Sequence, residues 1–122
     1  MSRILLIEDS PTERSVISSW IKGLGHEVIE AETAEEGMDQ AINQAPDLIL
    51  MDIVLPGKNG FEAIRALRAR DNTRDIPVII ISTKSQPTDV AWGKRQGAVD
   101  YLTKPFDKKA LAKALEQAGL RA

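Results

Sequence analysis

The chain has 122 residues, which suits one domain, and 43% of them are hydrophobic, enough to form a core. A formal net charge of −2 argues against a surface built to bind nucleic acid, and the lack of cysteine excludes disulfides, thiolate catalysis and cysteine-based metal sites. The apolar run near the N-terminus is too short for a signal peptide or a membrane span, so we expect one cytoplasmic domain over residues 1–122, without membrane insertion.

The first predicted strand is the continuous apolar run at residues 4–7, a pattern typical of a strand that is buried on both faces. A helix is expected to follow it. Ser10 is the predicted N-cap, Pro11 suits the first helical position, and Glu13 is expected to complete a capping box. The apolar residues of this helix recur at helical spacing and are Val16, Ile17, Trp20, Ile21 and Leu24.

The second strand and helix have weaker signals. Residues 28–29 form a short apolar segment, which suits a strand at the edge of a sheet. The helix after it is expected to be capped by Thr33, with Glu36 in the same capping pattern. Its inward residues are predicted to be Met38, Ala41 and Ile42.

Two further continuous apolar runs, at residues 48–51 and 78–81, predict two more buried strands. Between them, Asn59 and Glu62 are expected to cap a third helix. The inward residues of that helix are predicted to be Phe61, Ile64 and Leu67.

The last third of the chain predicts two helices with an edge strand between them. The helix over residues 87–96 is short and contains Gly93. Its expected apolar face consists of Val90, Ala91 and Trp92. Residues 101–102 predict the second edge strand, and a final helix is expected to begin near Asp107. The apolar residues of the final helix are Leu111, Ala114, Leu115 and Ala118.

Five repeats of strand and helix predict an α/β fold. Right-handed crossovers would place helices on both faces of a five-stranded parallel sheet. Because the two weak strands suit the edges, we expect the doubly wound, flavodoxin-like strand order 2-1-3-4-5.

Polar residues follow the predicted strands at their carboxyl ends, where such sheets bind ligands. They are Glu8, Asp9, Asp52, Ser82, Thr83 and Lys104. Carboxylates that lie close together repel one another unless a cation lies between them. Oxygen ligands without histidine or cysteine suit Mg²⁺, or alternatively Mn²⁺. We therefore expect a divalent cation at this edge of the sheet.

This set of residues also suits phosphoryl transfer. An aspartate such as Asp52 can attack phosphorus as a nucleophile and form an aspartyl phosphate. The charge on the transferred group must then be neutralised. The cation, the ammonium of Lys104 and the hydroxyl of Ser82 can each contribute to that neutralisation.

The motifs that carry these residues resemble those of the response-regulator receiver domains of bacterial two-component systems, over essentially the whole chain. The motifs are Ile7-Glu8-Asp9-Ser10, Leu50-Met51-Asp52-Ile53, Pro56-Gly57-Lys58-Asn59-Gly60, Ile79-Ile80-Ile81-Ser82-Thr83 and Tyr101-Leu102-Thr103-Lys104-Pro105-Phe106. The resemblance implies that Asp52 accepts a phosphoryl group from a sensor histidine kinase or a phosphotransfer domain, and that an output protein, which the sequence does not identify, reads the change. It also implies a protein that catalyses only its own phosphorylation and dephosphorylation.

The resemblance assigns roles to the remaining site residues. Asp9 and Asp52 would be direct Mg²⁺ ligands, Glu8 would act through water, and the backbone carbonyl of Val54 would be a further ligand. Ser82 would be the switch hydroxyl, Lys104 the phosphate clamp and Tyr101 the aromatic residue that changes rotamer on activation. The resemblance further implies a cis bond between Lys104 and Pro105. The face made by the fourth helix, fifth strand and fifth helix is expected to change shape.

A finer resemblance is to the single-domain regulators of type IV pilus twitching motility, which belong to chemotaxis-like pathways. It is carried by Asp9-Ser10-Pro11-Thr12-Glu13, Ser82-Thr83-Lys84 and Trp92-Gly93-Lys94-Arg95-Gln96-Gly97-Ala98. Thr83 adds a hydroxyl beside the site where many receivers have alanine. Val54 offers no polar side chain to position a hydrolytic water, so we expect the phosphoryl group to be lost slowly or with a partner's help.

Several other functions fit this sequence less well. An aspartyl phosphatase would need a second acid two residues after Asp52, where this chain has Val54. A flavodoxin-like electron carrier would need a phosphate-binding first loop, whereas Glu8 and Asp9 repel phosphate. No helix-turn-helix segment is recognisable in the sequence. A phosphate sink and a phosphorylation-independent pseudo-receiver remain as alternatives.

Three weaker signals predict no function. His26 is isolated in a predicted loop and is expected to be exposed. Arg65, Arg68 and Arg70 are expected to form a solvated helix face. The stretch Gly57-Lys58-Asn59-Gly60 lacks the spacing of a P-loop.

Overall fold

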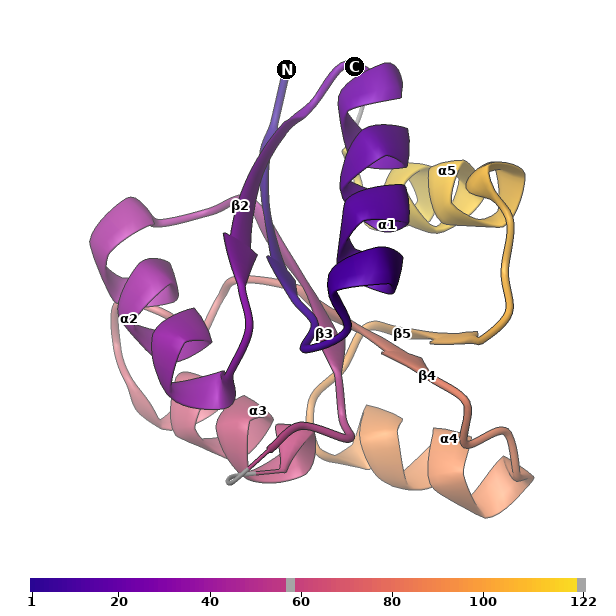
Figure 1. Cartoon of the computed structure of the whole chain (residues 1–122). Helices are drawn as coiled ribbons and strands as arrows, with labels where there is room; N and C mark the ends of the chain where they lie inside the picture. Colours follow the sequence, from indigo (N-terminus) through magenta and orange to yellow (C-terminus); the bar gives the residue numbers. More distant parts are fainter. Residues whose placement is uncertain (57–58, 121–122) are drawn as a thin grey trace.

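The computed structural model describes residues 1–56 and 59–120, and in them one parallel sheet lies between two layers of helices (Figure 1). The strand order is β2-β1-β3-β4-β5, which confirms the predicted topology. The strands are β1 (Arg3–Ile7), β2 (Glu27–Ala31), β3 (Leu48–Asp52), β4 (Val78–Ser82) and β5 (Asp100–Thr103). The helices are α1 (Pro11–Gly23), α2 (Ala34–Gln44), α3 (Gly60–Ala69), α4 (Pro87–Arg95) and α5 (Lys108–Gln117). None of these helices is long and apolar enough to cross a membrane.

The core is divided by the sheet into two apolar clusters, which explains why the central strands show no alternation of polar and apolar residues. In β1, Leu5 and Ile7 pack on the side of α2, α3 and α4, while Ile4 and Leu6 pack on the side of α1 and α5. Figure 1 shows the same division, with α1 and α5 on one side of the sheet. Every residue of β3 and β4 is buried. The two weak segments are β2 and β5, and both lie at the edges as predicted.

The helix starts follow the predicted capping pattern. The side chains of four residues each accept a hydrogen bond from the backbone N–H three residues later, and these residues are Ser10, Thr33, Asn59 and Asp107. The capping box predicted for Glu13 is wrong. The Ser10 N–H donates instead to the Glu8 carboxylate over 3.1 Å, and the Glu13 carboxylate lies 3.3 Å from the ammonium nitrogen of Lys104.

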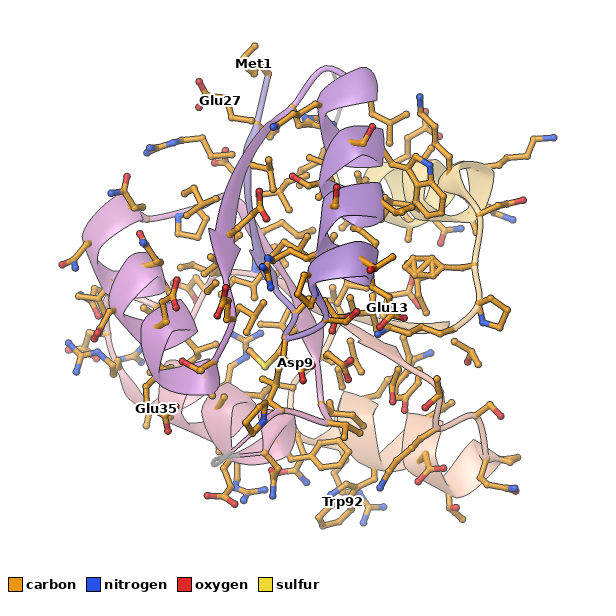
Figure 2. All side chains as sticks on the ribbon, in the orientation of Figure 1. Met1, Asp9, Glu13, Glu27, Glu35 and Trp92 are labelled. Atoms are coloured by element: carbon orange, nitrogen blue, oxygen red, sulfur yellow. The ribbon has the colours of Figure 1, made fainter. Side chains whose placement is uncertain are left out.

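Helix α4 packs differently from the prediction. Ala91 and Trp92 are exposed, and Figure 2 shows Trp92 pointing away from the sheet. The buried residue of α4 is Gly93. A Cβ at that position would lie 2.7 Å from Cδ1 of Ile80 and 3.1 Å from the ring of Tyr101, so glycine allows the helix to approach the sheet closely.

The predicted exposure of His26 is wrong, because its imidazole is only 6% exposed. The backbone N–H of Ser2 donates to its Nδ1 atom over 3.2 Å. Burial, and then the positive charge of the N-terminus, lower the pKa of His26, whereas Asp47 opposes this shift. The residue is therefore part of the structure at the amino end of β1 and β2.

The predicted solvated face of α3 is wrong for Arg68. Its guanidinium donates to the backbone carbonyls of Arg74, Ile76 and Gly97 over 2.7, 2.9 and 3.1 Å. These bonds join the end of α3 to the segments before β4 and β5. Arg65 is exposed, as predicted. The motif residues Gly57 and Lys58 lie outside the described residues.

Candidate functional site

The carboxyl ends of the strands bring the predicted acidic residues together. Glu8 and Asp9 follow β1, and Asp52 is the last residue of the neighbouring strand β3. Carboxylate oxygens of these three residues lie within 4.8 Å of one another. Figure 2 shows Asp9 at the turn between β1 and α1, on the side of the molecule where α1 begins.

Lys104 lies among these acids, although it comes from the loop after β5. Its Nζ atom is 2.6 Å from Oε1 of Glu8 and 2.9 Å from Oδ2 of Asp52. A third carboxylate, that of Glu13 in α1, is 3.3 Å away. The side chains of Lys104 and Glu8 are 8% and 1% exposed, so this is a buried ion pair. The bond between Lys104 and Pro105 is cis, as the resemblance implied.

Burial and charge shift the pKa values of this pair. Burial raises the pKa of Glu8, and the hydrogen bonds from Lys104 and the Ser10 N–H only partly oppose that shift. Burial alone would lower the pKa of Lys104, but its hydrogen bonds to Asp52 and Glu8 outweigh that effect and raise the pKa well above its usual range. Lys104 is therefore a permanent positive charge beside Asp52.

The carboxylate of Asp52 is held by two donors. Its Oδ1 atom accepts from the backbone N–H of Val54 over 2.9 Å, and its Oδ2 atom accepts from Lys104. Asp52 is 7% exposed, whereas the Val54 side chain is 54% exposed. The turn after β3 therefore fixes the carboxylate and leaves the apolar side chain of Val54 in solvent.

Ser82 and Tyr101 are linked through one residue of the loop after β4. The buried Ser82 hydroxyl accepts from the Lys84 N–H over 3.1 Å, and the Tyr101 hydroxyl donates to the Lys84 carbonyl over 2.7 Å. Thr83 lies between Ser82 and Lys84 and is exposed. The structure thus places the predicted switch residues around the same peptide segment.

The acidic residues fit a small divalent cation. All of their ligand atoms are carboxylate oxygens, which Mg²⁺ prefers, and opposite ligands of one Mg²⁺ lie about 4.2 Å apart. Because the three carboxylates already lie within 4.8 Å, a small inward movement is enough for them to meet one ion. The exposure of Asp9 leaves the site open to water and to a phosphate oxygen.

Three residues at this site were not predicted from the sequence. Glu13 contacts Lys104, and the guanidinium of Arg14 donates to the backbone carbonyl of Glu8 over 2.8 Å. Lys84 links Ser82 and Tyr101 through its backbone. The only sequence signal for Glu13 and Arg14 is that they lie in the first turns of the helix after Glu8, and this does not show which way their side chains turn.

An open apolar groove of about 320 Å³ lies beside Lys104. It runs between α1 and the loop after β5, and its apolar lining includes Val16, Trp20 and Phe106. The rings of Trp20 and Phe106 meet edge to face, with centroids 6.1 Å apart. The groove joins an apolar surface to the charged site.

Comparison with known proteins gives a consistent result. The model of the response regulator receiver domain family matches residues 4–116. The protein PilH of Pseudomonas aeruginosa is 50% identical over 115 residues, which cover 94% of this chain and 95% of PilH. Several other curated relatives are longer, and the chain spans 44 to 49% of their length.

Solved structures show the same similarity. The chemotaxis protein CheY4 of Vibrio cholerae has a TM-score of 0.91 and 30% identity, with 97% of this chain and 98% of CheY4 covered. The receiver domain of the sensor histidine kinase PA1611 from Pseudomonas aeruginosa has a TM-score of 0.90 and 33% identity, with 98% of both chains covered. That structure holds a magnesium ion in its active site cleft.

Proposed function

Since the chain belongs to the response regulator receiver domain family, we propose that Asp52 accepts a phosphoryl group in a Mg²⁺-dependent reaction and that the change is read by a partner protein. We further propose that residues 1–122 act as one receiver domain. The donor would be a phosphohistidine of a sensor histidine kinase or of a phosphotransfer domain.

The observation that supports this proposal best is the contact between Lys104 and Asp52. The ammonium lies 2.9 Å from a carboxylate that is also near two other acids. Burial of these charges costs desolvation free energy, so a role in the reaction accounts for them better than a gain in stability. In the transfer, one oxygen of Asp52 attacks phosphorus, a P–O bond forms and the P–N bond to the donor histidine breaks. The histidine nitrogen keeps the electron pair of the broken bond, and the proton on the other ring nitrogen leaves the imidazole neutral. Lys104 would stay close to Asp52 and donate to an oxygen of the new phosphoryl group.

Glu8, Asp9 and Asp52 would hold the cation, together with the backbone carbonyl of Val54. The bound Mg²⁺ would neutralise part of the negative charge on the transferred phosphoryl group. The protein groups have separate tasks. The Val54 N–H holds Oδ1 of Asp52, and Lys104 neutralises negative charge from the side of β5.

The proposed conformational change after phosphorylation begins at Ser82 and Thr83. An aspartyl phosphate offers strong acceptor oxygens, and the Ser82 hydroxyl can turn toward them, with Thr83 as a second hydroxyl nearby. The movement of Ser82 would disturb its bond with the Lys84 N–H, and Lys84 also accepts the bond from Tyr101. Tyr101 and α4 would then shift between two populations, because the phosphoryl contacts are made in only one of them.

The groove beside Lys104 supports the proposed encounter with a donor protein. Its apolar lining of Val16, Trp20 and Phe106 can be covered by an apolar side of the donor, and its charged end lies at Lys104. Similarity to PilH and to CheY4 supports a place in type IV pilus or chemotaxis-like signalling. Either direct output or a phosphate sink is compatible with the same site.

The test is the intact mass of the protein after incubation with acetyl phosphate and Mg²⁺. We expect a gain of one phosphoryl group in the wild type, and no gain without Mg²⁺ or in Asp52→Asn. If the wild type gains no phosphoryl group from acetyl phosphate or from a phosphorylated phosphotransfer domain, the proposal fails and a phosphorylation-independent binding module is favoured.

A further inference from the structure

Arg14 lies in α1 beside the candidate site, and its side chain is only 13% exposed. Its Nη1 atom donates to the backbone carbonyl of Glu8 over 2.8 Å. The other two nitrogens meet carboxylates at the end of β2 and just after it, with Nε 3.1 Å from Glu30 and Nη2 3.2 Å from Glu32. Arg14 therefore ties the turn after β1 to the neighbouring edge strand.

The carbonyl that accepts from Arg14 belongs to the peptide unit between Glu8 and Asp9. On the other side of this turn, the Glu8 N–H donates to the carbonyl of Ala31 over 3.0 Å. These two bonds hold Glu8 between β2 and α1. The plane of a peptide bond is rigid, so the orientation of this peptide unit fixes the backbone N and Cα atoms of Asp9 and limits the directions that its side chain can take.

Asp9 depends on its backbone for its position. Glu8 is held by Lys104 and by the Ser10 N–H, and Asp52 is held by Lys104 and by the Val54 N–H. Within residues 1–56 and 59–120, no hydrogen bond or ion pair holds the carboxylate of exposed Asp9. Its approach to the other two acids therefore rests on the turn that Arg14 stabilises.

We infer that Arg14 is a positioning residue for the cation site, because its bond to the Glu8 carbonyl keeps the carboxylate of Asp9 facing those of Glu8 and Asp52. This inference rests on the proposed function only in that the site binds Mg²⁺. Arg14 itself touches neither the cation nor the phosphoryl group.

Charge alone predicts the opposite effect of removing Arg14. A guanidinium near the site repels Mg²⁺, and its loss would leave the carboxylates of Glu30 and Glu32 without their partner. Electrostatics would therefore make Mg²⁺ bind more tightly to an Arg14 variant. Positioning would make it bind more weakly, so the sign of the change distinguishes the two.

The experiment measures the Mg²⁺ dissociation constant by titration calorimetry, with no phosphoryl donor present. For Arg14→Gln we expect Mg²⁺ binding to weaken about tenfold, as is typical when a residue that orients a metal ligand is lost. The matched control is Glu32→Gln, which removes one ion pair of Arg14 but leaves its bond to Glu8. We expect its dissociation constant to stay within about twofold of the wild type, because the Glu32 carboxylate is exposed and screened by salt.

Urea unfolding without Mg²⁺ establishes that each variant is folded under the titration conditions. If Arg14→Gln is not folded, Arg14→Lys replaces it, since lysine retains the charge but offers one donor group for three acceptors. Its Mg²⁺ binding is expected to be weaker than that of the wild type. Unchanged or tighter Mg²⁺ binding in the folded variant overturns the inference but leaves the proposed function intact. A wild type that binds no Mg²⁺ overturns both.

Discussion

The Nζ atom of Lys104 lies 2.9 Å from Oδ2 of Asp52, although the two residues are 52 positions apart in the chain. The same nitrogen is 2.6 Å from Oε1 of Glu8, so a single ammonium pairs with two nearly buried carboxylates and offsets one of their two negative charges. A positive charge in this position does part of the work that a divalent cation would do. The stability of the domain should therefore depend on Lys104 and Mg²⁺ together.

Replacement of Lys104 tests this dependence. Without divalent cations, Lys104→Met should lower the free energy of unfolding by about 3 kcal/mol, because Glu8 and Asp52 lose the charge that pairs them. Millimolar Mg²⁺ should raise the melting temperature of Lys104→Met more than that of the wild type. The control is Lys109→Met, an exposed lysine of α5. Equal losses in the two variants, or a Mg²⁺ effect of the same size in wild type and Lys104→Met, would refute the expectation.

Val54 should set the lifetime of the phosphoryl group. Its side chain is 54% exposed and lies two residues beyond Asp52, so asparagine there can position a water molecule without disturbing the core. We expect Val54→Asn to shorten the lifetime about threefold to tenfold, measured by the decay of phosphorylated protein after the donor is removed. Val99→Asn is a matched control, since Val99 is 53% exposed and lies just before β5. The idea is abandoned if both variants decay at the wild-type rate.

Arg68 should contribute strongly to stability. Its guanidinium donates to three backbone carbonyls, whereas Arg65 in the same helix makes one bond, of 2.9 Å, to the side chain of Gln96. Arg68→Met should cost about 2–3 kcal/mol, because three backbone carbonyl groups, two of them partly buried, lose a charged donor. Arg65→Met should change stability by less than about 0.5 kcal/mol. Urea unfolding of both variants measures the two losses, and equal losses would show that the three bonds of Arg68 contribute no more than the single bond of Arg65.

His26 should make stability depend on pH. Its folded-state pKa is lowered by burial, so the unfolded chain takes up a proton first as the pH falls below about 6.5, the ordinary histidine value. The unfolded state is then favoured, and the stability that His26 contributes is present above that pH and is lost in acid.

The variant His26→Asn keeps an acceptor for the Ser2 N–H but does not titrate. Relative to this variant, the wild type should lose free energy of unfolding between pH 7.5 and pH 5, measured by urea unfolding at each pH. Parallel pH profiles for the two proteins would mean that His26 is not responsible.

The sequence predicted those site residues that lie at the carboxyl ends of strands. In a parallel sheet, the residues after neighbouring strands must lie at one edge, so Glu8, Asp9 and Asp52 could be placed together from their positions alone. The contacts of Glu13 and Arg14 could not be predicted in this way. Their side chains reach the site only because of the rotation of α1 about its axis, and that rotation depends on packing against the sheet.

The pattern of apolar runs and caps was enough to determine the strand order and the carboxyl-end location of the site, because burial on both faces and right-handed crossovers leave few alternatives. The local sequence did not determine which individual polar side chains are exposed. Whether His26 and Arg68 are solvated depends on the backbone groups of Ser2, Ile76 and Gly97, which the tertiary fold places beside them. A buried polar group must find such partners. Ser2 lies 24 positions from His26 and Gly97 lies 29 positions from Arg68, so only the packed sheet and helices bring them into range.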